Sequence, residues 1–81
     1  LSEAIFHNLR LIRGAEVLVL IKRIGKNRVR VNFRSKGKVN VNKIAKFFGG
    51  GGHHNASGAT IEGGSISSVE KKVIPFVKRH L

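Results

Sequence analysis

The chain has 81 residues, and its 16 Lys and Arg against 4 acidic residues give a formal net charge of +12. A chain of this length supports one small domain with a thin core. The charge predicts an anionic partner, nucleic acid first and an anionic membrane surface second. A solubility surface is the alternative explanation of the charge.

What the chain lacks limits its chemistry. It contains no Asp and no cysteine, and its Glu residues are scattered. A two-metal phosphoesterase site needs several carboxylates or histidines around its metals, so this chain cannot build one alone. The lack of cysteine excludes thiolate metal sites and favours a cytoplasmic protein. No apolar run approaches the roughly 18 residues of a membrane span, so no spanning segment is expected. Of the two anionic partners, nucleic acid is the expected one and a membrane is not.

The N-terminal segment shows a helical spacing of apolar residues. They lie at Leu1, Ala4, Ile5, Leu9 and Ile12, and Gly14 supplies a stop signal. We therefore expect residues 1–14 to form a helix that connects an upstream domain to a second domain over residues 15–81.

The next segment reads as a β-hairpin over 16–24 and 27–35. The continuous apolar run from Val17 to Ile21 predicts a strand covered on both faces. The second strand alternates, with Val29, Val31 and Phe33 on one face and Arg28, Arg30, Asn32 and Arg34 on the other. Neighbours along that arginine face are about 6.6–6.8 Å apart, within reach of successive phosphates. Arg28, Arg30 and Lys36 extend this basic stripe, for which a solvated strand face is the alternative.

A helix is predicted over about 41–48. Val41, Ile44, Ala45 and Phe48 form its apolar stripe, Asn40 or Asn42 is the candidate N-cap, and Gly49 follows its end. Phe47 lies off the stripe. We interpret it as a second core contact, with a platform for base stacking as the alternative.

The C-terminal third predicts a short strand over 58–62 and a helix over about 67–79. Ser67 and Glu70 fit a capping box, and Pro75 predicts a kink or a break. The chain is therefore expected to be a single small α/β domain, with a mixed sheet of four to five short strands flanked by helices at about 41–48 and 67–79.

The segment with the strongest functional signal runs from Gly49 to Gly58. Four consecutive glycines let the backbone approach a ligand closely and turn its N–H groups toward an anion. The pattern matches neither a Walker loop nor the dinucleotide fingerprint, and a flexible linker is the alternative.

His53 or His54 would donate a hydrogen bond to a phosphate or sugar oxygen, or else bond a nearby carbonyl and hold the turn. Adjacent histidines rarely share one metal ion, so no metal site is expected within the chain. The small residues of 56–58 suggest a wall where the backbone passes close to a ligand.

These residues resemble a known family. The signature consists of Arg34-Ser35-Lys36, then 39–45 (Val-Asn-Val-Asn-Lys-Ile-Ala), then Gly49–His53 and 56–58. It is similar to that of the DHH-associated C-terminal domain of DHH-family phosphoesterases, and the likeness covers about residues 15–81. Members include oligoribonucleases, phosphatases of adenosine 3′,5′-bisphosphate, cyclic-dinucleotide phosphodiesterases and single-strand exonucleases. The family often has Ala-Ala-Gly where this chain has Ala-Ser-Gly, a change that should keep the close backbone approach.

The resemblance implies a division of labour. An upstream catalytic domain would hold two manganese ions and cut the substrate, while this chain would bind short single-stranded nucleic acid or a nucleotide without catalytic residues or a cofactor of its own. The implied binding residues are Arg34, Ser35, Gly50, Gly51, Gly52 and His53, with Ser57 in the adjoining wall. The parent protein would then be a metal-dependent phosphodiesterase, and the sequence leaves open whether it is a homodimer. A basic RNA-binding module similar to the C-terminal domain of alanyl-tRNA synthetases and a docking module remain alternatives.

Overall fold

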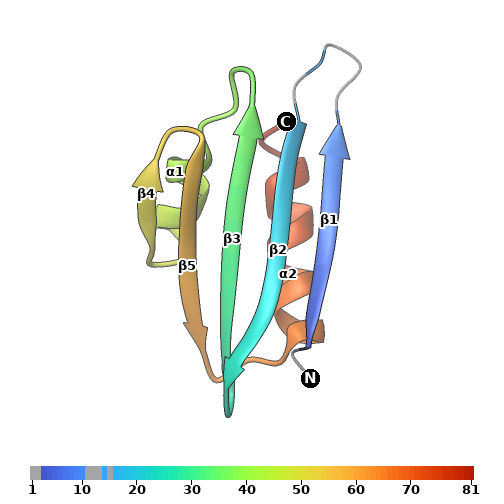
Figure 1. Cartoon of the computed structure of the whole chain (residues 1–81), viewed down its shortest axis with the longest axis vertical. Coiled ribbons are helices and arrows are strands. Elements are labelled where there is room, and N and C mark those ends of the chain that lie inside the picture. The colour runs from blue at the N-terminus through green and yellow to red at the C-terminus, as the bar shows by residue number, and fades with distance from the viewer. Residues whose placement is uncertain (1–2, 11–13, 15) are drawn as a thin grey trace.

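Two helices cover one face of a five-stranded sheet in the computed structural model, which describes residues 3–10, 14 and 16–81 (Figure 1). The strand order is β1-β2-β3-β5-β4, and every pairing is antiparallel. The elements are β1 (Ala4–Arg10), β2 (Glu16–Gly25), β3 (Arg28–Lys36), α1 (Val41–Phe47), β4 (Gly51–His53), β5 (Ala56–Glu62) and α2 (Ile66–Lys78). The single small α/β domain and its hairpin are confirmed, but the sheet is antiparallel and not mixed.

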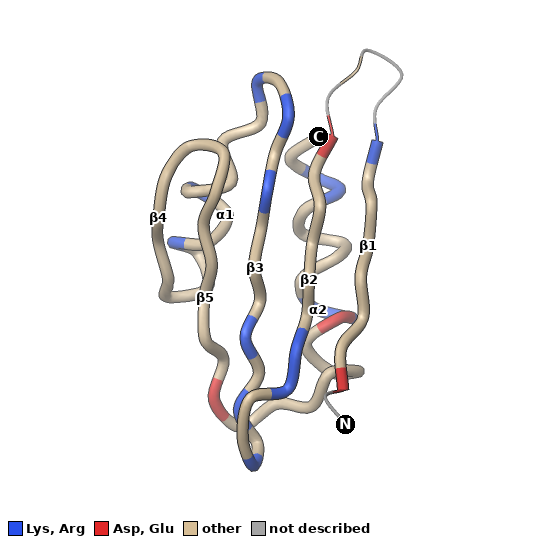
Figure 2. The backbone as a smooth tube through the Cα atoms, viewed as in Figure 1, with Lys and Arg blue, Asp and Glu red and all other residues tan. Residues whose placement is uncertain are grey.

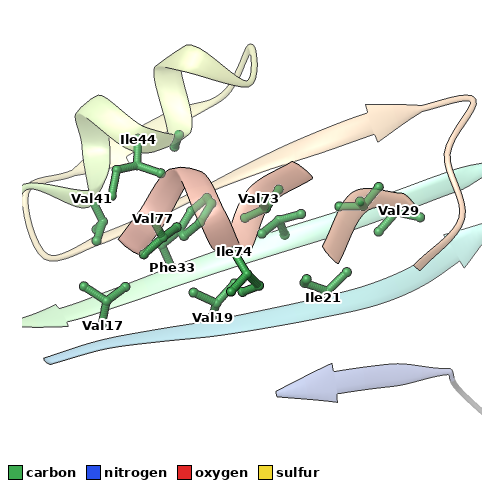
Figure 3. Close-up of a cluster of buried hydrophobic side chains, with 13 residues drawn as sticks. Val17, Val19, Ile21, Val29, Phe33, Val41, Ile44, Val73, Ile74 and Val77 are labelled. Carbon is green, nitrogen blue, oxygen red and sulfur yellow. The ribbon is translucent and has the colours of Figure 1, made fainter. Parts of the chain in front are cut away.

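The core lies between the sheet and the two helices (Figure 3). Alternate residues of β2 and β3 supply its floor, and the apolar stripes of α1 and α2 cover it. Its buried members are Val17, Val19, Ile21, Val29, Val31, Phe33, Val41, Ile44, Ala45, Val69, Val73, Ile74 and Val77. Burying such a side chain contributes about 1.5–3 kcal/mol, so this one-sided core fixes which face of β3 points away from the helices.

The first element is a strand and not the expected helix. β1 runs from Ala4 to Arg10 along the edge of the sheet, where it pairs with β2. Ile5 and Leu9 pack against the core, and between them His7 Nε2 lies 2.7 Å from Glu70 Oε2 on α2. Leu1, Ile12 and the expected domain boundary at residue 15 lie outside the described residues.

β2 is covered by helices on one face only. Val17, Val19 and Ile21 are fully buried, whereas Leu18 and Leu20 are half-buried on the opposite face. The expectation of a strand covered on both faces is therefore wrong for the part of the chain that the structure describes. Two leucines are left on a sheet face that carries no helix.

α1 begins and ends at the expected residues. The Asn40 side chain accepts from the backbone N–H groups of Asn42 and Lys43, and Gly49 follows with φ of +82°. Phe47 is 67% exposed, so its expected core contact is wrong. Its ring stacks instead on Phe76 of α2, with ring centroids 4.1 Å apart.

α2 starts one residue earlier than expected because another serine caps it. The Ser65 hydroxyl accepts from the Ser68 N–H, and the Ser68 hydroxyl accepts from the Ser65 N–H. The expected cap at Ser67 with Glu70 is therefore wrong, and Glu70 pairs with β1 instead. Pro75 lies inside the helix without ending it, so the expected break is also wrong. No helix within the described residues is long and apolar enough to cross a membrane.

Candidate nucleic-acid interface

The sheet face that the helices leave uncovered carries the candidate site. Cross-strand partners share a face of a sheet, so the register identifies the residues on it. Arg34 pairs with Leu18 on one side and Ala56 on the other, and Ala56 pairs with His53. These four residues form one row across β2, β3, β5 and β4, here called the Arg34 row.

The Arg34 row brings together two of the residues expected to bind phosphate. Arg34 and His53 stand on either side of Ala56, with backbones about 10 Å apart across two strand spacings. Both side chains are exposed, whereas Ala56 is partly buried and projects only a methyl group. The row therefore has a cation at β3, an imidazole at β4 and a shallow gap between them.

The glycine run forms a strand as well as a loop. Gly49 turns the chain out of α1, and Gly51 to His53 form the edge strand β4, which pairs with β5. A Cβ at Gly50 would collide with the Gly58 carbonyl oxygen and lie 2.7 Å from the Ala59 Cα. Glycine is thus needed at Gly50 because β5 passes so close. The expected flexible-linker alternative does not describe a segment that pairs in a sheet.

The turn after His53 is tied to the ends of two other elements. Asn55 Nδ2 donates to the Ser35 hydroxyl oxygen over 2.8 Å, and the Ser35 N–H donates to the Asn55 carbonyl oxygen over 2.9 Å. On the other side, the Val41 N–H donates to the His54 carbonyl oxygen over 2.8 Å. His53 is thereby held at a fixed position relative to β3 and the start of α1.

Ser35 and Ser57, which the sequence placed in the site, donate their hydroxyl groups to backbone carbonyls of the protein itself. The Ser35 hydroxyl donates to the Val39 carbonyl oxygen over 2.8 Å. The Ser57 hydroxyl donates to the Val41 carbonyl oxygen over 2.7 Å, and Ser57 is only 6% exposed. Ser57 therefore faces α1 and not the open face. Both side chains position the walls of the site, and neither presents a free hydroxyl donor in this structure.

Basic residues extend along β3, as expected from the alternation (Figure 2). Arg28 Nε donates to Glu62 Oε1 over 2.7 Å. Arg30 donates to Asn32 Oδ1 and to Thr60 Oγ1, and its guanidinium lies over Gly58. Arg34 forms no ion pair with any described residue, and its guanidinium donates only to the Phe33 carbonyl oxygen. Of these three arginines, Arg34 is the one that has neither a carboxylate partner nor a side-chain acceptor among the described residues, so its charge is the most available for a phosphate.

Several residues at this face were missed by the sequence interpretation. Asn55 carries no motif signal, since only the fold brings its amide to Ser35. Phe6, Leu18 and Leu20 were assigned to a helix or to a fully covered strand, yet all three lie on the open face. The signal that could have found them is the one-sided core, which leaves every second apolar residue of β2 uncovered.

The described residues contain no group of three His, Cys, Asp or Glu side chains that would hold a metal ion. The resemblance implies manganese on the upstream domain of the parent protein, and the described residues of this chain would not hold it.

The fold and the open face together define a class of protein: a small α/β domain with helices on one side of its sheet and a basic, glycine-lined surface on the other. The chain matches the family model of the DHHA1 domain over residues 2–79. It belongs to the DHHA1 domain family.

Three curated proteins show what the chain is similar to. Over 73 residues it is 34% identical to the "bifunctional oligoribonuclease and PAP phosphatase NrnA" of Thermus thermophilus, covering 90% of this chain and 22% of that protein. It is 55% identical over 38 residues to the protein of the same name from Mycoplasma pneumoniae, covering 47% of this chain and 11% of that protein. A "membrane protein-large ribosomal subunit bL9 fusion protein" of onion yellows phytoplasma is 31% identical over 67 residues, covering 83% of this chain and 8% of that protein. The chain spans about a fifth or less of each relative.

Proposed function

We propose that this chain is the substrate-binding domain of a metal-dependent phosphodiesterase that acts on short single-stranded nucleic acid or small nucleotides. The carrying observation is the Arg34 row, in which an arginine without an ion pair and an exposed histidine flank a small residue. The net charge of +12 supports an anionic ligand. The Thermus and Mycoplasma relatives, which are named as oligoribonucleases and phosphatases, support the substrate class.

Arg34 is the main anchor of the proposed complex. Its planar guanidinium binds a phosphate through two parallel hydrogen bonds. His53 and the backbone N–H groups of Gly51 and Gly52 bind oxygens of the same or the adjacent phosphate. The Gly50 N–H, expected from the sequence to take part, is excluded because it already donates to the Ala45 carbonyl oxygen over 2.8 Å. Ala56 leaves room for that phosphate between Arg34 and His53.

The chain's contribution to catalysis is positioning. The proposed catalytic domain lies upstream in the parent protein and carries manganese, which would activate the attacking water and stabilise charge on the phosphate. Holding the terminal phosphate and nucleotide in one geometry lowers the entropic part of the barrier at that domain. The absence of cysteine accords with a cytoplasmic protein.

A matched pair of arginines tests this function. Arg34 and Arg28 lie on the same face of β3, but Arg28 is already paired with Glu62 at the far end of the strand. A 5′-phosphorylated dinucleotide would be titrated into the wild-type chain and the Arg34→Ala and Arg28→Ala variants, with backbone amide shifts recorded. We expect Arg34→Ala to weaken binding about tenfold or more, since hydrogen bonds to charged groups contribute about 1.5–3 kcal/mol. Arg28→Ala should change it less than twofold.

Two other results would contradict the proposal. Equal losses in both variants, with affinity that grows with oligonucleotide length, would indicate a general basic RNA-binding surface. No shift at Gly50–His53 or Arg34 at millimolar dinucleotide would indicate a docking module that binds no nucleotide.

A further inference from the structure

A shallow hollow lies on the open face next to the Arg34 row. It has a volume of about 200 Å³ and is lined by Phe6, Leu18, Leu20, Asn32 and Arg34. A second hollow of about 240 Å³ shares Leu18 and Arg34 with it. The two hollows therefore meet at Arg34. The residues that line the first come from β1, β2 and β3, which are neighbouring strands of the sheet (Figure 1).

The floor of this hollow is apolar although no helix of the described residues covers it. Phe6 is 60% exposed, and the register pairs it with Leu20, which in turn pairs with Asn32. Phe6 is therefore an aromatic ring beside two half-buried leucines, on a face that also carries Arg30 and Arg34 of β3. An exposed aromatic ring next to cations is the arrangement with which proteins stack the bases of single strands.

The positive charges around the hollow favour a ligand that carries phosphates over a purely apolar partner. Arg34 lies at one end of the hollow. At the other end, beyond the row of Leu20 and Asn32, Lys22 and Arg30 pair across β2 and β3 on the same face. Glu16, which lies on this face, is already 3.5 Å from the Arg10 guanidinium. A ligand that combines an apolar ring with a phosphate matches both halves of the surface.

We propose that this hollow is a base subsite, in which Phe6 stacks one nucleobase of the strand whose phosphate Arg34 binds. Leu18 and Leu20 form the floor under that base, and the Asn32 side chain lies at its edge, where an amide can hydrogen-bond a base. This inference rests on the proposed function, because the base reaches Phe6 only when the phosphate is at Arg34. It adds recognition of the base to recognition of the phosphate.

The test compares ligands with and without a base. The probes are a 5′-phosphorylated dinucleotide and ribose 5-phosphate, titrated into the wild-type chain and the Phe6→Ala, Arg34→Ala and Phe47→Ala variants. Phe47 is the matched control because it is an equally exposed phenylalanine that packs on α2 and not on the open face. Phe6→Ala should weaken dinucleotide binding about 5- to 150-fold, the loss expected for one stacked base. It should leave ribose 5-phosphate binding unchanged within twofold, as should Phe47→Ala for both probes.

The outcomes distinguish failure of the base subsite from failure of the proposed function on which it rests. If Phe6→Ala leaves dinucleotide binding unchanged while Arg34→Ala weakens both probes, the base subsite is wrong and the phosphate site stands. If Arg34→Ala weakens neither probe, the proposed function fails as well.

A tryptophan reporter gives a second readout that does not depend on the alanine variant folding. The chain contains no Trp, so Phe6→Trp and Phe47→Trp each introduce a single fluorophore. Dinucleotide should quench Trp at position 6 and not at position 47. If the signal at position 6 instead changes with protein concentration in the absence of ligand, a second copy of the chain covers the face, and the base subsite is overturned.

Discussion

The Asn55 side-chain amide donates to the Ser35 hydroxyl oxygen over 2.8 Å, which joins the turn after β4 to the end of β3. Ser35 immediately follows Arg34, and Asn55 lies two residues after His53. The bond therefore links β3 and β4, the two strands that carry the proposed phosphate-binding residues Arg34 and His53. These two residues are 19 positions apart in the chain. Ser35 acts on the site through this link and its bond to the Val39 carbonyl oxygen.

Removing this link should loosen the site more than the fold. Asn55→Ala deletes an exposed hydrogen bond, for which we expect a loss of about 0.5–1.5 kcal/mol in the free energy of unfolding. Dinucleotide affinity should fall about 2- to 10-fold, because part of that energy holds His53 in place. Denaturant unfolding and amide-shift titration measure the two effects.

The Ser35→Ala/Asn55→Ala double variant is the control for this mechanism. Because the two side chains act through one bond, their effects on dinucleotide affinity should be less than additive. Additive losses would show that the residues act independently and would contradict the positioning role.

Neighbouring glycines of the run should respond differently to alanine. Gly50→Ala places a Cβ against the backbone of β5, so we expect a loss of about 1–3 kcal/mol in the free energy of unfolding. Gly51→Ala brings its Cβ no closer than 3.8 Å to Asn42 Oδ1, an ordinary contact, so its cost should stay within about 1 kcal/mol. Thermal and denaturant unfolding of the two variants, compared with wild type, checks this order. Equal stabilities would show that β4 does not pack closely on β5.

The hairpin and α1 could be predicted because their signals are local. The strict alternation from Arg28 to Arg34 predicts a strand. Asn40 as N-cap and Gly49 after the last turn predict the two ends of a helix. β1 could not be predicted in the same way. Its inward positions are Ile5, His7 and Leu9, so a polar residue interrupts the apolar period, and Phe6 adds an apolar residue on the outside. Pairing with β2 and the contact of His7 with Glu70 determine its conformation, and neither is visible in a local window.

The residues of the candidate site could be named from the sequence, but their arrangement could not. The glycine run stood out by its residue types, and the family resemblance implied Arg34 and the Gly50–His53 segment as binding residues. The fold places Arg34 and His53 in one row. β4 has almost no side chains to show a period, so only its pairing with β5 reveals it as a strand. Ser57 was identified for its small size, but its hydroxyl faces α1, because residues 56 and 58 occupy the open face and 57 must take the other.

Salt dependence should distinguish a defined phosphate site from a diffuse basic surface. If Arg34 neutralises one phosphate, Arg34→Ala should lower the slope of log affinity against log salt by about 0.7 for a single-stranded ligand. Arg28→Ala should leave the slope unchanged, because Arg28 remains engaged with Glu62 in the wild type. Titrations of the 5′-phosphorylated dinucleotide at several salt concentrations measure both slopes. A smaller slope in both variants would indicate that the whole arginine face contributes.

Pro75 is a place where the chain can be stabilised without touching the site. It lies inside α2, exposed, where it removes one backbone hydrogen-bond donor from a helix that continues to Lys78. Proline in a helix interior costs about 3 kcal/mol relative to alanine, and the lower entropy of the unfolded proline chain offsets part of this. Pro75→Ala should therefore raise the free energy of unfolding by about 1–3 kcal/mol and raise Tm by about 4–8 °C for each kcal/mol.

Lys71→Ala, an exposed change one turn earlier on α2, is the control and should change the free energy of unfolding by no more than about 0.5 kcal/mol. Because α2 covers the face opposite the Arg34 row, dinucleotide affinity should be unchanged in both variants. A less stable Pro75→Ala variant would show that the proline ring contributes packing that outweighs the missing donor.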